Sequence, residues 1–451
     1  MATDSLAAGL PARVTALQPQ ARDDLAALVR IASVSADPAR AAQVQASAAW
    51  VAQQARDLGA ATVEVVGAAG GLPAVLASWP APPGAPTVLL YAHHDVQPAD
   101  PAGWSSDPFE PVERDGRLYG RGAADDKAGV LAHLTALRAH DGRPPVGVTL
   151  FVEGEEEIGS PTFGAFLSEY RDRLAADVLV VADSQNWSPE VPALTTTLRG
   201  LVDCRVQVRT LRRPVHSGMY GGAVPDALSA LVRLLASLHD EAGDVAVAGL
   251  VRGSRPGPDL DEQAFRAEAG LVEGVELVGT GRLTDRIWMR PAVSVLAVDA
   301  PRVADVANIL VDAASAVVSM RLAPGQDPAT AMAALTDHLR ANAPWGAEVT
   351  VQPGSVGSPT IVPGQGPLVD LARQALRDAF GGAEPVQIGV GGSIPFIAEL
   401  AAVFPDAAIL VTGAGDPAAS WHGPDENLHL AMFERVCLFE ALLLSRLAPP
   451  D

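Results

Sequence analysis

Short aliphatic runs alternate with longer segments of helical periodicity over the first part of the chain. The runs with the length and apolar content of strands are 62–66, 74–79, 87–91, 146–151 and 177–182. The segments with apolar residues at helical spacing are 19–31, 41–58 and 130–139. We expect the first helix to begin at Pro19, since proline suits a first helical turn. Helices that alternate with aliphatic strands predict an α/β domain with a mixed sheet and helices on both faces.

The hydrophobic pattern changes after Arg199 and Gly200. Residues 201–208 alternate between apolar and polar side chains, as a half-buried strand does. The segments that follow are an apolar-striped helix over 227–238, a loop-rich stretch over 241–290, a strand at 293–298, and 304–322, which fits a helix or a strand equally well. Elements of the first kind resume at 367–380, 408–411 and 430–447. We therefore expect a smaller α+β domain inserted at 199–353, which divides the first domain into residues 1–198 and 354–451.

The composition narrows the class of protein. The chain has 451 residues, of which 48% are hydrophobic, and suits two or three domains of roughly 100–200 residues each. A net charge of −21 argues against nucleic acids and anionic membranes as partners. Cys204 and Cys437 form no spacing motif, and no run of about 18 apolar residues occurs. These features predict a cytoplasmic protein without a disulfide framework.

The strand at 87–91 delivers His93, His94 and Asp95 to its carboxyl end, where α/β sheets place their ligands. His93 and Asp95 are two positions apart, so they point the same way in an extended chain. A metal-bound histidine usually gives its other ring nitrogen to a carboxylate or a carbonyl. We expect His93 to be a metal ligand and Asp95 to be its partner. The alternative is a surface turn that contains two histidines.

Carboxylates follow other strands of the same domain. Asp125 stands before the helix at 130–139 and suits either a bridge between two cations or an N-cap, and taken alone it favours the cap. Four acids after the strand at 146–151, Glu153 and residues 155–157, suit either a solvated loop or a cation site. Asp183 ends the strand at 177–182 and is either a ligand or a turn former. His422 lies in a late polar loop.

Together these positions form one mixed donor set. Its members are His93, Asp125, Glu156, Glu157, Asp183 and His422. Two histidines with several carboxylates suit zinc, with manganese or cobalt as alternatives, better than magnesium or calcium, which prefer oxygen alone. The set is larger than one tetrahedral zinc requires. It therefore predicts two divalent metal ions about 3.5–4 Å apart, with one acid left as a general base.

The chain resembles the di-metal exopeptidase and amidohydrolase family of carnosine dipeptidase, cytosolic nonspecific dipeptidase, glutamate carboxypeptidase and succinyl-diaminopimelate desuccinylase. The resemblance is greatest to the dipeptidase branch. It rests on the motifs His93-His94-Asp95-Val96-Gln97-Pro98, Tyr119-Gly120-Arg121-Gly122 with Asp125-Asp126-Lys127, Glu153-Gly154 with Glu156-Glu157 and Gly159-Ser160, His216-Ser217-Gly218, and Gly391-Gly392-Ser393-Ile394-Pro395. It implies a metallopeptidase domain that is interrupted by a lid or dimerisation domain.

The resemblance also implies a role for each residue in the donor set. His93 and Asp183 hold one metal, Glu157 and His422 hold the other, and Asp125 bridges both and precedes a cis peptide bond. Glu156 is the general base, and Asp95 orients His93.

Further roles concern the substrate and a partner subunit. The resemblance implies that His216 stabilises the tetrahedral intermediate in the active site of the partner subunit of a homodimer. Arg321 binds the free carboxylate of the substrate, together with amides of Gly391, Gly392 and Ser393.

The expected activity is metal-dependent hydrolysis of an amide bond next to a free carboxylate, as in a dipeptidase or exopeptidase. The substrate is then a small peptide or an N-acyl amino acid, with no nucleic acid and no membrane involved. The alternatives are an N-acyl amino acid deacylase or desuccinylase of the same family, and a non-catalytic binding protein that keeps the fold. A serine hydrolase is disfavoured, because no Gly-x-Ser-x-Gly turn follows a strand.

Overall fold

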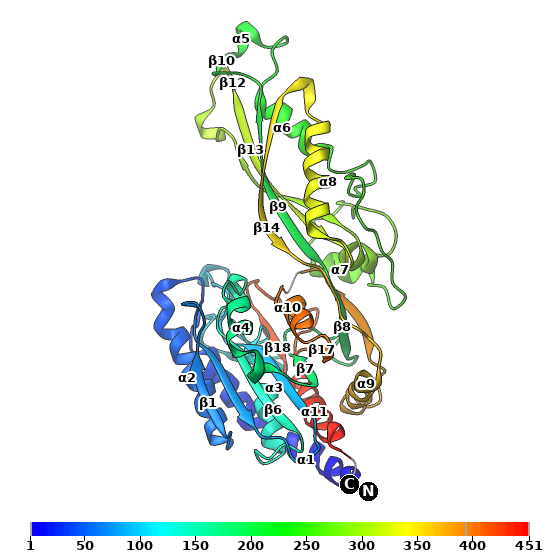
Figure 1. Cartoon of the computed structure of the whole chain (residues 1–451). Coiled ribbons are helices and arrows are strands. Elements are labelled where there is room, and N and C mark those ends of the chain that lie inside the picture. The colour runs from blue at the N-terminus through cyan, green and yellow to red at the C-terminus, as the bar shows by residue number, and fades with distance from the viewer. Residues whose placement is uncertain (1, 393–394, 450–451) are drawn as a thin grey trace. The chain divides into compact units, whose positions relative to one another are not determined.

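The computed structural model describes residues 2–392 and 395–449, and the chain divides into two compact units (Figure 1). The first unit comprises residues 1–196, 362–388 and 399–451, and the second comprises 197–361 and 389–398. The sequence predicted the inserted domain at 199–353. The second unit extends further, because β14 (Glu348–Gly357) and β15 (Thr360–Ile361) continue past the expected end.

The first unit is built on a mixed sheet, as the strand pattern predicted. Its strands in spatial order are β1 (Thr62–Val66), β2 (Ala74–Trp79), β6 (Gly147–Glu153), β3 (Thr87–His93), β7 (Val178–Val181), β17 (Ala408–Val411) and β8 (Ala193–Leu198), with β16 (Val386–Val390) paired to β8. The central strands β6, β3, β7 and β17 run parallel to one another. The outer pairs β1–β2, β2–β6 and β17–β8 are antiparallel. Strand β3 therefore lies in the middle of the parallel part, and its residues are buried from Val88 to His93.

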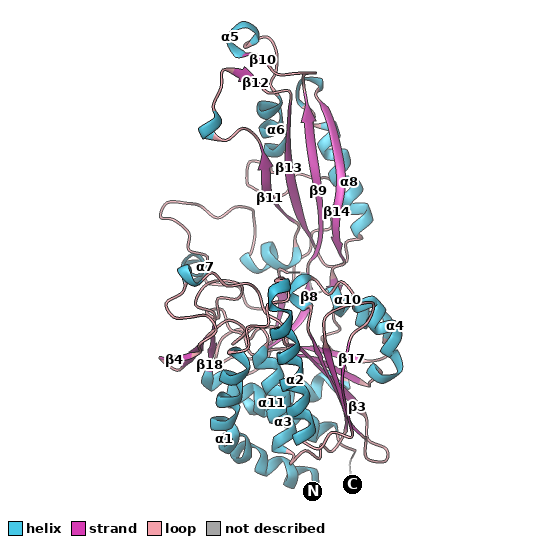
Figure 2. Ribbon diagram, turned by 90° about the vertical axis from the view of Figure 1, so that its left-hand side faces the viewer, coloured by secondary structure: helices cyan, strands magenta, loops and turns pink. Residues whose placement is uncertain are grey.

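Helices cover both faces of this sheet. Figure 2 shows α1 (Ala2–Val29), α2 (Ala41–Asp57), α3 (Lys127–Ala139) and α11 (Leu430–Leu447) together on one side. Val88, Leu90 and Ala92 of β3 belong to the same hydrophobic core as residues of these four helices. On the opposite face the Phe166 ring of α4 (Phe163–Leu174) stacks on Phe151 of β6, with 4.8 Å between ring centroids. The helix α9 (Pro367–Ala379) and a small sheet of β18 (Asn427–His429), β5 (Arg117–Tyr119) and β4 (Val112–Arg114) complete the unit, and α10 (Pro395–Val403) belongs to it from residue 399 onward.

The amino-terminal helix is longer than the sequence predicted. We expected it to begin at Pro19, but α1 begins at Ala2 and contains both Pro11 and Pro19. Its apolar stripe extends upstream of Pro19, since Leu10 and Val14 are buried in the main core beside Leu25 and Leu28. A proline inside a helix costs about 3 kcal/mol. Packing of this stripe against α3 and α11 offsets that cost.

The second unit combines an antiparallel sheet with helices, as expected for an α+β domain. Its strands in order are β11 (Ala292–Asp299), β13 (Ala313–Leu322), β9 (Gly200–Arg209) and β14. Burial alternates along β9, which confirms the period of two at 201–208. The helices α6 (Ala227–Ala236) and α8 (Pro328–Ala341) pack on the sheet. Each begins at an aspartate, because Asp226 accepts a hydrogen bond from the Ser229 N–H and Asp327 from the Thr330 N–H.

The ambiguous segment 304–322 is mostly strand. It contains β12 (Ile309–Leu310), which pairs with β10 (Val215–His216), and the long strand β13. β13 lies between β9 and β11, and these two neighbours decide its conformation where the local sequence does not. Two further short helices, α5 (Ser217–Tyr220) and α7 (Glu262–Glu268), lie in the loops.

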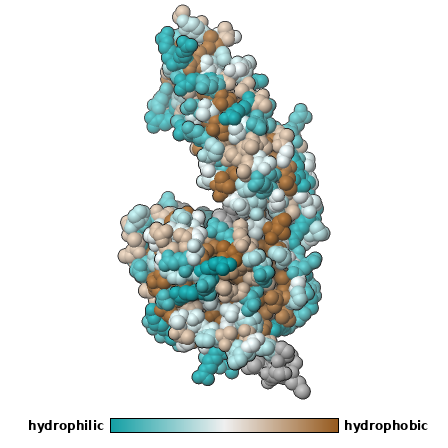
Figure 3. All heavy atoms as spheres, viewed as in Figure 1, coloured by the Kyte–Doolittle hydropathy of each residue, from teal (hydrophilic) through white to brown (hydrophobic). Residues whose placement is uncertain are grey.

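The face shown in Figure 3 mixes hydrophilic residues with smaller apolar groups. Within residues 2–392 and 395–449, no helix has the length and apolar content that a membrane span requires.

A buried ion pair links α3 to α11 in the first unit. His133 and Glu440 are both about 1% exposed or less, and His133 Nδ1 lies 2.7 Å from Glu440 Oε2. His133 Nε2 lies 2.9 Å from the Tyr91 carbonyl of β3. A carbonyl and a carboxylate both accept hydrogen bonds, so the ring satisfies both when it is protonated. Burial acts to lower the pKa of His133, but the charge and hydrogen bond of Glu440 outweigh it and raise that pKa above its usual value.

We expect Glu440→Leu to lower the free energy of unfolding by about 3–5 kcal/mol, because His133 loses its counter-charge. The raised native-state pKa of His133 means that protonation stabilises the fold fully below about pH 6.5, its usual value, and that this stabilisation disappears as pH rises through the native-state pKa. Denaturant unfolding of metal-free wild type and variant over a pH series checks both points. If the difference in unfolding free energy between wild type and Glu440→Leu stays constant up to high pH, His133 is neutral in the native state.

Candidate metal centre

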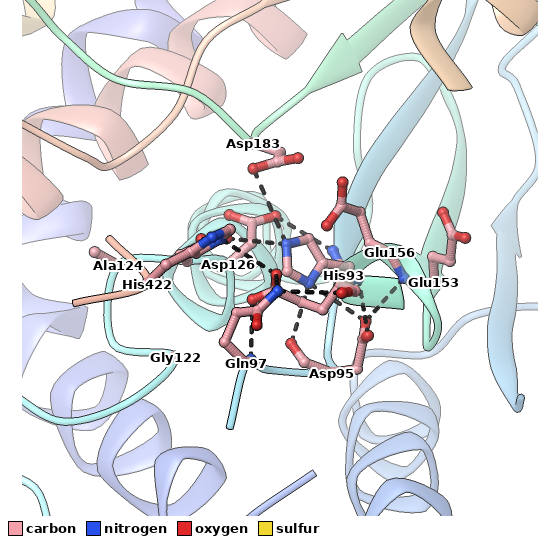
Figure 4. A network of polar contacts seen from close by, with 12 residues as sticks. His93, Asp95, Gln97, Gly122, Ala124, Asp126, Glu153, Glu156, Asp183 and His422 are labelled. Atoms are coloured by element: carbon pink, nitrogen blue, oxygen red, sulfur yellow. Dashed lines mark hydrogen bonds and ion pairs between the residues drawn. The ribbon is translucent and has the colours of Figure 1, made fainter. Parts of the chain in front are cut away.

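Side chains from five separate segments of the first unit meet at one end of the sheet (Figure 4). His93 ends β3, Glu156 opens a short 3-10 turn after β6, and Asp183 follows β7. β3 pairs in parallel with both β6 and β7, so their carboxyl ends lie at the same edge. Asp125 comes from the loop before α3, and His422 from the loop before β18. The sheet therefore brings together the six donors that the sequence singled out.

The carboxylate of Asp125 lies between the two histidines. Its Oδ1 is 3.1 Å from His93 Nε2, and its Oδ2 is 3.0 Å from His422 Nε2. Glu157 Oε2 lies 3.2 Å from His422 Nε2, and Asp183 Oδ1 lies 4.0 Å from His93 Nε2. The donors form two groups, His93 with Glu156 and Asp183, and Asp125 with Glu157 and His422, and within each group the ligand atoms lie within 4.8 Å of one another.

Asp125 is not the N-cap that its position alone favoured. The residue before α3 is Asp126, and its side chain makes no capping hydrogen bond to the helix. Asp126 Oδ2 instead accepts a hydrogen bond from the His93 backbone N–H at 3.3 Å. The peptide bond between Asp125 and Asp126 is cis, as the resemblance implied. Both aspartates thus face the donor set and leave the end of α3 uncapped by a side chain.

Glu426 holds the loop that carries Asp125. Its carboxylate is fully buried and accepts hydrogen bonds from the backbone N–H groups of Gly122, Ala124 and Asp125 at 3.0–3.1 Å. The Arg121 guanidinium donates to it at 2.6 Å. The sequence interpretation missed this role, because a glutamate in a polar loop carries no pattern that points to a distant backbone. The only signal is its place four residues after His422.

Asp95 and Gln97 hold the two glutamates. The Asp95 carboxylate accepts hydrogen bonds from the backbone N–H groups of Glu156 (3.2 Å) and Glu157 (3.1 Å). Its Oδ1 lies 3.4 Å from His93 Nδ1, and the Asp95 carbonyl lies nearer, at 3.1 Å. Asp95 therefore contacts His93 as expected and also fixes the turn that carries Glu156. Gln97, whose role the sequence interpretation missed, donates to Glu157 Oε2 from its side chain at 2.8 Å.

The acid cluster after β6 is not a uniformly solvated loop. Glu153 is buried and accepts a hydrogen bond from the Tyr91 hydroxyl at 2.6 Å. Glu155 is also buried and accepts hydrogen bonds from the Leu72 and Thr162 backbone N–H groups. Glu156 and Glu157 are partly buried and belong to the donor set. The first two acids thus have protein partners, whereas the last two face the other donors.

The electrostatics of the set favour added positive charge. Burial and the charge of Glu156 raise the pKa of Asp183 well above its usual value, although His93 opposes this. Burial, opposed by His93 and reinforced by Glu157, raises the pKa of Glu156 to about 8. Hydrogen bonds to Asp125 and Glu157 raise the pKa of His422 to about 10. The raised pKa values mean that bound protons compensate the negative charge of the clustered carboxylates. Divalent cations bound to the same nitrogen and oxygen atoms would replace these protons as the compensating charge.

The remaining predicted residues belong to the second unit. His216 is exposed, and its Nδ1 accepts a hydrogen bond from the Gly218 N–H at 3.1 Å. Arg321 is half-buried in β13, and its guanidinium makes no hydrogen bond or ion pair with any residue that the structure describes. Gly391 and Gly392 form a bend after β16, and Ser393 lies outside the described residues. The roles of these residues toward substrate stay predictions.

Comparison with known proteins identifies the family. A match to Peptidase family M20/M25/M40 spans residues 89–446. The chain belongs to this family. The cysteinylglycine-S-conjugate dipeptidase of Corynebacterium striatum is 40% identical to this M20 chain over 367 residues, which are 80% of this chain and 81% of that protein.

Two further relatives agree with this assignment. The Beta-Ala-His dipeptidase of Rattus norvegicus is 32% identical over 289 residues, which are 60% of this chain and 58% of that protein. The crystal structure of human carnosine dipeptidase 1 matches with a TM-score of 0.81 at 26% identity, over 98% of this chain and 99% of that chain. Members of the M20 family are metallopeptidases, and the donor set is what such an enzyme requires.

Two neighbouring glutamates give a test of the donor set. We expect Glu157→Ala to lower metal occupancy, because it removes a donor from the group with Asp125 and His422. Glu156→Gln should keep both metals and lose about 100-fold or more in kcat, because it removes only a proton acceptor. Elemental analysis after dialysis and steady-state kinetics check the pair, with Glu169→Gln on the exposed side of α4 as the matched control. Near-normal turnover by Glu156→Gln would contradict its assignment as the base.

Proposed function

We propose that this M20 family member is a dipeptidase that hydrolyses the peptide bond next to a free C-terminal carboxylate. The observation that carries the proposal is the Asp125 carboxylate, whose two oxygens face His93 on one side and His422 on the other. A single carboxylate shared between two donor groups is the arrangement that a two-metal hydrolase needs. The names of the relatives support a dipeptide substrate.

Two divalent cations are the cofactors of this proposal. His93 and Asp183 would hold one, Glu157 and His422 would hold the other, and Asp125 lies where it would serve both. Imidazole nitrogen with carboxylate oxygen favours zinc, with manganese and cobalt as alternatives. When bound, such cations supply Lewis-acid chemistry, because they polarise a carbonyl and make a water easier to deprotonate.

Glu156 is the proton carrier of the proposed reaction. It takes the proton of the attacking water on its carboxylate and returns it to the nitrogen of the leaving amine. The hydrogen bonds of Asp95 to the backbone N–H groups of Glu156 and Glu157 support this role, since they hold the turn that presents the base. His216 stabilises the tetrahedral intermediate, and Arg321 with the Gly391–Gly392–Ser393 turn binds the substrate carboxylate.

A homodimer is part of the proposal, with His216 acting in the active site of the partner subunit. The edge strand β11 supports it. β11 lies at one edge of the second unit's sheet (Figure 2), and its Val295, Leu296 and Val298 are 43%, 64% and 51% exposed. The segment that follows exposes Val303 and Val306. An apolar edge strand of this kind pairs readily with another chain, and a second copy of this one covers it in our proposal.

We also propose a cytoplasmic location. Its support is that Cys204 and Cys437 are both free and buried.

The experiment that tests the function is a hydrolysis screen of dipeptides against N-acyl amino acids. We expect dipeptides to be the better substrates. Chelation should abolish turnover, and zinc, manganese or cobalt should restore it. If N-acyl amino acids are preferred, the deacylase alternative holds. If neither class is hydrolysed by the metal-loaded protein, the chain is a binding protein that keeps the fold.

Complementation between two inactive variants tests the shared active site. We expect His216→Ala and Glu156→Gln to be nearly inactive as homodimers. Heterodimers of the two carry one intact site and one site that lacks both groups. Random pairing makes about half of the dimers mixed, so about a quarter of wild-type activity should return. Verified heterodimers without activity, or a fully active monomer in light scattering, would reject the shared site.

A further inference from the structure

Arg199 ties the Gly391 turn to residue 286 within the second unit. It stands between β8 and β9, and its backbone N–H donates to the Val390 carbonyl at 3.2 Å. Its Nε donates to the Gly391 carbonyl at 3.0 Å, and a terminal nitrogen donates to the Arg286 carbonyl at 3.4 Å. The second terminal nitrogen, Nη2, has no partner among the described residues. The guanidinium thus lies directly against the Gly391 turn and keeps a donor free.

Arg321 lies on the same face of the sheet. Leu201 of β9 pairs with Arg321 of β13, and side chains of paired residues project to the same face. Arg199 is two residues before Leu201, so the alternation of an extended chain directs it to that face as well. Burial and the charge of Arg321 lower the pKa of Arg199 to about 10, which agrees with two neighbouring guanidinium groups.

The two guanidinium groups lack a counter-charge. The chain has 53 acidic residues, yet none of those described forms an ion pair with Arg199 or Arg321. Both arginines are half-buried, so water screens their repulsion only in part. Partly buried charges are normally paired, because desolvation without a partner costs free energy. An anion beside both groups removes the repulsion and supplies the missing partner.

A cavity opens beside the same corner. Its volume is about 250 Å³, and its lining includes Arg199, Ile287 and Ala292. Ala292 pairs with Arg321 across the sheet, and the Ile287 carbonyl lies against Gly391. Arg199 thus lines a cavity whose other lining residues include neighbours of Arg321 and of Gly391, and this cavity is wide enough for a carboxylate or a small side chain.

We propose that Arg199 is a specificity-determining residue, the second cation that receives the C-terminal carboxylate of the substrate beside Arg321. A planar guanidinium with a free donor suits a carboxylate oxygen, and two such groups hold both oxygens. The hydrogen bond from Arg199 to Gly391 also fixes the turn whose amides face the same carboxylate in the proposed function. This inference rests on the dipeptidase function and on the placement of Arg321 at the carboxylate.

The competing explanation is a purely structural clamp, in which Arg199 only ties the Gly391 turn to residue 286. The two explanations differ in what happens when the substrate loses its charge. If Arg199 is only a clamp, its replacement weakens binding of a dipeptide and of its C-terminal amide alike, because both need an intact turn. If Arg199 binds the carboxylate, its replacement weakens binding of the free acid only.

Steady-state kinetics on a dipeptide and its C-terminal amide separate them. We expect Arg199→Met to raise KM for the free acid by about tenfold or more, with kcat changed much less, because a hydrogen bond to a charged group is lost. The KM for the amide should change little. Arg199→Lys keeps the positive charge but loses the planar guanidinium with its paired donors. Its KM for the free acid should lie between those of wild type and Arg199→Met. Arg209→Met, an exposed arginine of the same strand β9, is the matched control and should behave as wild type.

A binding measurement separates failure of this inference from failure of the proposed function. Calorimetric titration of the dipeptide and its amide into Glu156→Gln, with and without Arg199→Met, needs no turnover. We expect the free acid to bind about tenfold or more tightly than the amide, and Arg199→Met to remove most of that preference. Equal losses for acid and amide, or an unchanged preference, would overturn the role of Arg199. Absence of hydrolysis by wild type, with the preference intact, would overturn only the dipeptidase function.

Discussion

The proposed metal centre depends on the carboxylate of Asp125. It has one oxygen near His93 and the other near His422, in a region where several carboxylates are buried together. Buried carboxylates placed close together are unfavourable unless protons or cations neutralise them. The donors must therefore be held in place by hydrogen bonds that do not depend on these protons or cations. The structure provides them in Glu426, which fixes the backbone before Asp125, and in Asp95 and Gln97, which fix the two glutamates.

The parallel sheet explains why donors from distant segments meet. Parallel strands end at one edge, and the residues that follow β3, β6 and β7 supply His93, Glu156 and Asp183 there. The helices on both faces bury the strands and leave this edge as the place where polar side chains gather. The second unit carries a different kind of group. The sequence predicted His216 and Arg321 there, and the structure adds Arg199. None of the three has an acidic partner among the described residues, and in our proposal they face the anionic part of a substrate.

Much of this arrangement could be read from the sequence, because strand patterns fix where strands end. The strand before His93 and the strand before Asp183 were clear from their aliphatic runs, and the metal-ligand chemistry followed from what came next. Asp125 was ambiguous, since an aspartate before a helix is usually a cap. Glu426 and Gln97 were missed, because their partners are backbone amides and side chains that only the folded chain brings near. The start of α1 was misplaced, as no local pattern shows that packing offsets two prolines inside a helix, and α4 and β8 were not predicted at all.

We propose that Asp125 lies between two cations. Anomalous X-ray diffraction from crystals of the zinc-loaded protein tests it most directly. The account predicts two anomalous peaks about 3.5–4 Å apart, one beside His93 and Asp183, the other beside Glu157 and His422, with an oxygen of Asp125 next to each. A single peak, or two peaks that Asp125 does not separate, would contradict it.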